Sequence, residues 1–298
     1  MPQITHDGIT LEYETHGSPS DPALLLIMGL GAQLTLWPIE LVEALVARGY
    51  FVIRHDNRDI GLSTKFTEAG VPDMQAVVTA LMGGRKPDIP YTLSDMAGDA
   101  VAVLDAAGVA KAHVVGASMG GMIAQLVAVE HPDRVLSLTS IMSTTGNPTL
   151  PPARPEVMAA LLAPVDPNAD LDAAVERGAS LWRTIGSPGY PADPERLRAN
   201  VTRDYQRSFH PTGPARQMAA IVADGDRRAR LSGIKAPTLV IHGADDPLVP
   251  VEGGRDTAAS IPGAKIVEIP GMGHDLPVEL VDTIADAIAE HAKATVSA

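Results

Sequence analysis

Residues 112–128 read AHVVGASMGGMIAQLVA, and this stretch decides the fold. The apolar run Ala112–Val115 predicts a buried strand, and Gly121–Ala128 predicts a helix. Between them, Gly116–Gly120 forms a G-x-S-x-G pattern with Ser118 at its centre. A serine in a sharp strand-to-helix turn projects from the backbone, where a base can reach one side of its hydroxyl and a carbonyl group the other. Ser118 is therefore the candidate nucleophile, and the alternative is a serine that only caps the helix.

Short runs elsewhere in the chain predict further strands, and the wholly apolar run Ala23–Met28 is typical of a strand buried on both faces of a parallel sheet. They are Ala23–Met28, Tyr50–His55, Val135–Met142, Thr238–His242 and Lys265–Ile269. Helical segments at about 38–48, 92–107 and 277–292 alternate with them. Ile9–Glu14 alternates apolar and polar residues, which is typical of a half-buried edge strand. This order indicates an α/β fold, with a mostly parallel central sheet and helices on both faces.

The segment 145–225 differs from the rest of the chain. It is rich in proline, and helical patterns near 154–162, 169–185, 193–208 and 214–223 follow one another without a strand. We therefore predict a core made of residues 1–144 and 226–298, with a helical cap, or lid, inserted at 145–225. The cap should cover the carboxyl ends of the strands, where open α/β sheets place their chemistry. The irregular segment 67–90 is a candidate for one wall of the pocket.

A serine hydroxyl needs a base to remove its proton and an acid to orient that base. In the strand–turn–helix arrangement these partners follow the serine along the chain, the acid first and the histidine last. His274 suits the base because it lies in a loop directly after a predicted strand, whereas His291 falls in the terminal helix and is expected to be solvated. Asp245 and Asp246 both follow the strand Thr238–His242. Asp246 is favoured because a proline fixes the backbone after it, and Asp245 is expected to bond within its own turn.

The tetrahedral intermediate also needs an oxyanion hole. The backbone N–H groups of Met119, after the candidate nucleophile, and of Leu30, in the loop after an early strand, are the expected donors. The alternative for the second donor is a plain glycine turn. Candidate pocket residues are Gly29, Trp37, Leu181, Trp182 and Met218. Ordinary core packing is the competing interpretation for each of these side chains.

Composition excludes several classes of function. The 298 residues carry a net charge of −13, which disfavours nucleic acid and anionic membranes as partners. No cysteine is present, so disulfides, thiolate catalysis and Cys-ligated metals are excluded. No apolar run has the length of a membrane helix, and no signal peptide is recognisable. We expect a cytoplasmic monomer or homodimer that acts on a small molecule.

The histidines do not form a metal-ligand pattern. His55 and His242 lie at the ends of predicted strands and are expected to be structural, and no H-x-x-x-H pair occurs. We predict neither a metal nor an organic cofactor. Tyr190 and Tyr205 lie in the insertion, where packing within the cap is the preferred interpretation over an activating role.

Five stretches together carry a family resemblance. They are Met28–Gly31, His55–Ser63, Gly116–Gly120, His242–Pro250 and Gly271–His274. On these the chain resembles the α/β-hydrolase fold superfamily over essentially its whole length. The D-x-R-D-x-G-x-S pattern at 56–63 and the position of the cap are most similar to Ser-dependent carboxylesterases of the aclacinomycin-methylesterase type. The resemblance implies that the acid is the aspartate ahead of the proline, Asp246.

Two positions depart from the family pattern. Many relatives carry histidine where this chain has Met28, and many carry glycine where it has Asp59. Either change is expected to reshape the pocket without touching the three candidate catalytic residues.

The sequence thus predicts a serine carboxylesterase that works through a Ser118–His274–Asp246 triad and a covalent acyl-enzyme. Haloalkane dehalogenases and epoxide hydrolases share the fold but use an aspartate nucleophile, so Ser118 argues against both. Three alternatives stay open: a carbon–carbon bond hydrolase or a cofactor-free perhydrolase with the same triad, and a non-catalytic ligand-binding member of the fold.

Overall fold

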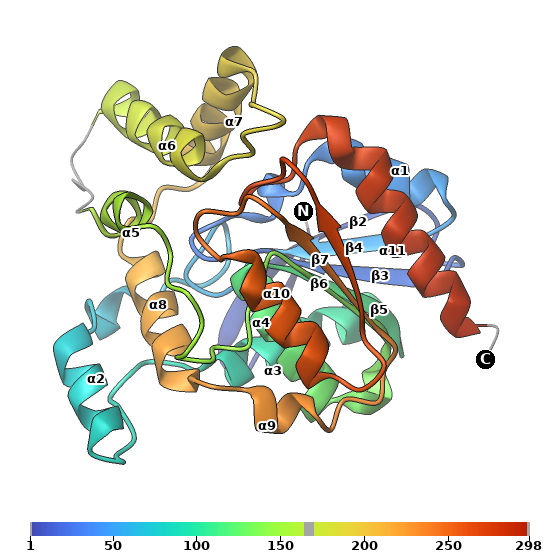
Figure 1. Ribbon diagram of the computed structural model, residues 1–298, viewed down its shortest axis with the longest axis horizontal. Coiled ribbons are helices and arrows are strands. Elements are labelled where there is room, and N and C mark those ends of the chain that lie inside the picture. The colour runs from blue at the N-terminus through green and yellow to red at the C-terminus, as the bar shows by residue number, and fades with distance from the viewer. Residues whose placement is uncertain (1, 164–169, 297–298) are drawn as a thin grey trace.

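The structure is a computed structural model that describes residues 2–163 and 170–296 (Figure 1). A single eight-stranded sheet in the order β1-β2-β4-β3-β5-β6-β7-β8 runs through its centre. The strands are β1 Gln3–His6, β2 Ile9–His16, β3 Ala23–Ile27, β4 Phe51–His55, β5 Ala112–Ala117, β6 Val135–Ile141, β7 Thr238–Gly243 and β8 Lys265–Ile269. β3 to β8 pair in parallel, and β1 and β2 are antiparallel to their neighbours. The strand order reverses between β3 and β5, so the loops after these two strands diverge and leave a crevice.

The prediction that Ile9–Glu14 forms an edge strand is wrong. β1 occupies the edge, and β2 lies between β1 and β4. The polar residues of β2 suggested an exposed edge, but Glu14 has a partner on the neighbouring strand and Glu12 lies inside the protein. Glu14 accepts two hydrogen bonds from Arg54 of β4, and Glu12 is buried. β1 itself is short and polar, with no apolar alternation to reveal it.

Helices cover both faces of the sheet. Their bounds are α1 Ile39–Ala47, α2 Met74–Met82, α3 Leu93–Ala106, α4 Met119–Glu130, α5 Pro155–Leu162, α6 Leu171–Ile185, α7 Pro194–Arg207, α8 Gly213–Asp224, α9 Arg228–Leu231, α10 Val251–Ser260 and α11 Val281–Val296. Successive residues of a strand point to opposite faces. Leu25 and Ile27 accordingly join the apolar cluster with α3 and α4, while Leu24 and Leu26 join the cluster with α1 and α11. The wholly apolar strand pattern follows from burial on both sides. Of the helices described, none is long and apolar enough to cross a membrane.

Helices α5 to α8 lie between β6 and β7, within 145–225, and are called the cap below. α6 and α7 pack against each other and stand away from the sheet in Figure 1. The predicted helix at 169–185 is described from Leu171 onward, and its first residue lies outside the described residues. The segment 67–90 forms α2, which packs on α8 and contributes no residue to the cavity described below, so the expectation that it forms a pocket wall is wrong.

Candidate active site

The turn between β5 and α4 holds Ser118 in an unusual backbone conformation. Its φ and ψ are 57° and −122°, a region that side chains rarely adopt. A Cβ on Gly116 would lie 2.0 Å from the carbonyl oxygen of Gly120, and one on Gly120 would lie 2.0 Å from that of Ile27. Only glycine therefore fits on either side of the serine. Close contact of strand and helix fixes the direction in which the Ser118 hydroxyl projects.

The structure brings Ser118, His274 and Asp246 together from three separate loops. His274 Nε2 lies 3.0 Å from Ser118 Oγ, and its Nδ1 lies 2.7 Å from Asp246 Oδ2. The other carboxylate oxygen of Asp246 accepts the backbone N–H groups of Leu248 and Val249, at 2.9 and 2.8 Å. His274 and Asp246 are both buried, and this hydrogen-bonded chain has the geometry of an activated serine nucleophile.

Asp245 behaves differently from its predicted role. Its carboxylate accepts the backbone N–H of Gly271 at 2.8 Å, so it ties the turn after β7 to the loop that carries His274. Bonding within the turn, which was expected of Asp245, is instead made by Oδ1 of Asp246. A carboxylate has two oxygens, and Asp246 uses one for its own turn and the other for the histidine.

The loop after β3 passes directly over the serine. A Cβ on Gly29 would lie 3.0 Å from the Cβ of Ser118. The backbone N–H groups of Leu30 and Met119 donate to no acceptor among the described residues, which leaves them available as the predicted oxyanion donors. Asn57 Nδ2 donates to the Met28 carbonyl at 2.8 Å and holds one end of this loop.

A second support for the same loop comes from the cap. Gln217 of α8 is fully buried, and its Oε1 accepts the backbone N–H of Gly31 at 2.8 Å. Its Nε2 donates to the carbonyl of Arg58 at 3.0 Å. Gln217 could not be predicted from the sequence, because no local pattern shows which cap residue lies opposite the glycine loop.

A cavity of about 630 Å³ opens above Ser118 and His274. Six of the eleven methionines line it: Met28, Met119, Met122, Met142, Met158 and Met218. Gly29, Leu30, Leu181 and Trp182 also lie in its wall. Trp37 does not, and its assignment to the pocket was wrong. Its side chain is fully buried in the apolar cluster on the α1 and α11 face of the sheet.

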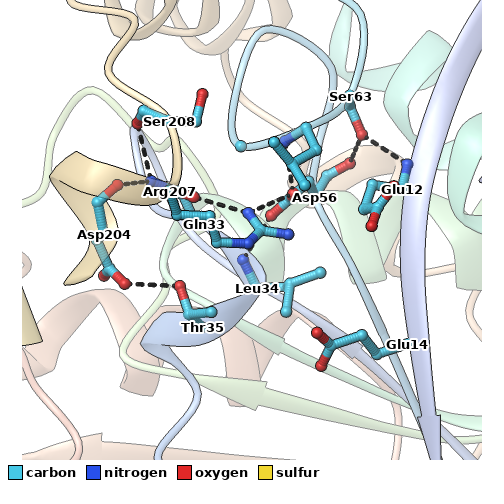
Figure 2. A network of polar contacts seen from close by, with 12 residues as sticks. Glu12, Glu14, Gln33, Leu34, Thr35, Asp56, Ser63, Asp204, Arg207 and Ser208 are labelled. Atoms are coloured by element: carbon cyan, nitrogen blue, oxygen red, sulfur yellow. Dashed lines mark hydrogen bonds and ion pairs between the residues drawn. The ribbon is translucent and has the colours of Figure 1, made fainter. Parts of the chain in front are cut away.

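Polar contacts fasten the end of α7 to the core, as Figure 2 shows. Gln33, after β3, donates from Nε2 to the carbonyl oxygens of Asp204 and Ser208 at 2.5 and 2.9 Å. Arg207 donates to Gln33 Oε1 and to Asp56 Oδ2, both at 2.7 Å. Asp56 is fully buried, so Arg207 supplies the positive charge that compensates it. The cap is thus attached to the two loops that follow β3 and β4.

Asp59 anchors a second cap helix. Arg216 of α8 forms a bidentate ion pair with the Asp59 carboxylate, at 2.8 and 2.9 Å. The Tyr91 hydroxyl donates to the same carboxylate at 2.6 Å. Burial opposes ionisation, but these hydrogen bonds outweigh it and lower the pKa of Asp59. Asp59 does not itself line the cavity, and that its departure from glycine reshapes the pocket stays a prediction. Its departure from glycine pairs with an arginine in the cap.

The Arg216→Leu variant should lose about 3–5 kcal/mol of unfolding free energy, because Asp59 would keep a buried charge without its cation. Urea unfolding measures this loss. The double variant Asp59→Gly, Arg216→Leu also removes the carboxylate, and glycine accepts the φ of 70° at this position. We expect it to recover about 2 kcal/mol or more. A loss below about 1 kcal/mol in the single variant would contradict this role for the ion pair.

Three further histidines considered in the sequence, His55, His242 and His291, lie away from Ser118 Oγ and contact other parts of the protein. Burial lowers the pKa of His55 to about 4. His242 Nε2 lies 2.8 Å from the carbonyl oxygen of Val249, and burial lowers its pKa as well. His291, expected to be solvated, is half-buried, with Nε2 3.1 Å from the carbonyl oxygen of Pro237. Within 2–163 and 170–296, no group of three or more His, Asp or Glu side chains is arranged to hold a metal ion.

A family model described as the alpha/beta hydrolase fold matches residues 22–279. The chain belongs to the α/β-hydrolase fold family. It is 34% identical to rhodomycin D methylesterase of Streptomyces peucetius over an alignment of 313 positions, gaps included, that covers 98% of this chain and 97% of the relative. The predicted fold class and the resemblance to methylesterases are therefore confirmed, and the chain is a hydrolase by family.

Two solved α/β hydrolases share the architecture. The enol-lactonase from Burkholderia xenovorans has a TM-score of 0.72 and 24% identity, covering 98% of this chain and 100% of that one. A 2-hydroxy-6-oxo-6-phenylhexa-2,4-dienoate hydrolase from Rhodococcus also has a TM-score of 0.72, with 20% identity and coverage of 98% and 97%. At these identities the likeness shows the fold alone.

Proposed function

We propose that this hydrolase is a serine carboxylesterase. The observation that carries the proposal is the chain of contacts from Ser118 Oγ to His274 and on to Asp246, at 3.0 and 2.7 Å, at the base of an apolar cavity. The identity to a methylesterase over nearly the whole chain supports an ester as substrate and methanol or a similarly small alcohol as leaving group.

The proposed reaction has two halves. Ser118 Oγ attacks the ester carbonyl carbon while its proton passes to His274 Nε2, and the N–H groups of Leu30 and Met119 bind the oxyanion. The C–O bond to the alcohol then breaks, and the alcohol takes the proton from His274. Water next gives a proton to His274 and attacks the acyl carbon. The acid leaves as Ser118 regains its proton.

The charges around the cavity favour an uncharged substrate over a carboxylate. Five acidic residues and two arginines line it, the arginines being Arg196 and Arg203. Both have acidic partners, since Arg196 donates twice to Glu40 at 2.8 Å and Arg203 donates to Asp204 at 2.9 Å. A substrate carboxylate would thus meet no unpaired guanidinium among the described lining residues. This argues against carbon–carbon cleavage of a dienoate.

Neutral p-nitrophenyl butyrate should be hydrolysed with a kcat/KM about tenfold or more above that of mono-p-nitrophenyl succinate, at low ionic strength. Added salt should reduce this difference in kcat/KM, because it screens the acidic residues that line the cavity. Glu40→Gln, which releases Arg196, should narrow it by a few-fold as well. A preference for the succinate would overturn the neutral-ester proposal. Turnover of neither ester by folded protein would shift the assignment to carbon–carbon cleavage, perhydrolysis or ligand binding.

The cytoplasmic location and the monomeric or dimeric state stay predictions from the sequence, as does the absence of a cofactor.

A further inference from the structure

The loop that carries His274 is held from two sides. Its first part is bound to the core, since Asp245 N donates to the Met272 carbonyl and the Asp245 side chain accepts from Gly271. The next residues are bound to the cap. His274 N donates to the carbonyl of Ile185, the last residue of α6, at 2.8 Å.

Ser187, two residues beyond α6, bridges the positions on either side of the histidine. Its hydroxyl accepts the backbone N–H of Gly273 at 2.8 Å and donates to Oδ1 of Asp275. One hydroxyl can donate once and accept at the same time, so both contacts are compatible. Ser187 is buried, and the bridge encloses His274 between its two partners.

Close packing leaves little freedom at this junction. A Cβ on Gly273 would lie 2.5 Å from the carbonyl oxygen of Gly186, and one on Gly189 would lie 2.7 Å from Gly271 Cα. Gly189 N also donates to the Gly271 carbonyl at 2.9 Å. The cap segment 185–190 therefore packs tightly against the loop that carries His274.

We propose that Ser187 is a positioning residue, which acts through Gly273 and Asp275 to hold His274 in line with Ser118 and Asp246. The inference rests on the proposed function of His274 as the base. Ser187 itself does not reach Ser118. Without the Ser187 hydroxyl, the N–H of Gly273 would lack its acceptor, and the Asp275 carboxylate beside the histidine would lose a donor. A displacement of the base by a fraction of an ångström slows proton transfer without changing how the substrate is bound.

The Ser187→Ala variant tests this role in the full-length protein. For p-nitrophenyl butyrate we expect kcat to fall about 10- to 100-fold while KM changes less than about twofold. The downfield proton resonance of the hydrogen bond between His274 and Asp246, assigned by its loss in His274→Gln, should shift or broaden. This resonance needs no substrate, so it reports on positioning even if the esterase proposal fails.

Three further variants make the test specific. Ser180→Ala removes an exposed serine of α6, the cap helix that ends two residues before Ser187, and should leave kcat and the resonance unchanged. Ser187→Thr keeps the hydroxyl and should restore most of the activity. Asp275→Ala removes the acceptor instead, and should alter the resonance even if Ser187→Ala does not fold. A kcat within about twofold of wild type in Ser187→Ala, or a lower kcat with an unchanged resonance, would overturn the proposal.

Discussion

The Ser118→Ala variant should lose ester hydrolysis, with kcat for p-nitrophenyl butyrate reduced by about 10³-fold or more. The reason is that His274 then has no hydroxyl to activate, 3.0 Å from its Nε2. The backbone N–H groups of Leu30 and Met119 stay in place, so a residual rate above that in water is expected.

A matched control distinguishes this effect from a general disturbance of the site. Ser143 is buried beside α4, where its Cβ and Oγ would be the atoms nearest to a Cβ placed on Gly121. Its hydroxyl has no hydrogen-bond partner among the described residues. Ser143→Ala should keep kcat within about twofold of wild type. If Ser118→Ala hydrolysed the ester as fast as wild type, the assignment of Ser118 as nucleophile would be wrong.

Asp246→Asn should lower kcat by about 10⁴-fold, the loss expected when a triad histidine is held in the wrong tautomer. The structure gives a specific reason. Oδ1 of Asp246 accepts from Leu248 and Val249, so the carbonyl oxygen of an asparagine would take that place. Its NH₂ group would then face His274 Nδ1 and donate to it. The proton of the imidazole would lie on Nε2, which could no longer accept the proton of Ser118.

Asp245→Asn is the control for this prediction. An asparagine oxygen can still accept the N–H of Gly271, so kcat should fall less than about tenfold. Measuring kcat/KM for both variants against pH shows which of the two aspartates orients His274. Near-native turnover by Asp246→Asn together with inactive Asp245→Asn would show that the acid had been assigned to the wrong residue.

Much of the fold could be predicted because its signals are local. The apolar run of β3 is short and continuous, and the glycines around Ser118 leave few alternatives to a tight strand–helix turn. The place of β2 in the sheet could not be predicted, because it depends on pairing with β4 and on the ion pair of Glu14 with Arg54, 40 positions away. Trp37 was wrongly assigned to the pocket for a similar reason. An apolar residue looks the same in the sequence whether its side chain is buried in the core or lines a cavity.

The three residues that meet at the site could be chosen from chain order and from their positions just after strands. Their supports could not. Ser187, Gln217 and Arg207 lie in the cap, where helical pattern alone does not show which side chain faces the core. Asp59 was noticed as a departure, but its meaning depends on Arg216, 157 residues later. Such pairings belong to tertiary structure and leave no local pattern in the sequence.

With Ser118 as nucleophile, hydrolysis passes through an acyl group on its hydroxyl. The most direct measurement is to quench the enzyme in acid during turnover of a p-nitrophenyl ester, digest it, and locate the acyl mass by peptide mass spectrometry. We expect a burst of p-nitrophenol matched by acylation of the peptide that contains Ser118, and neither in Ser118→Ala. A burst with Ser118 unmodified, or an acyl group on another residue, would contradict it.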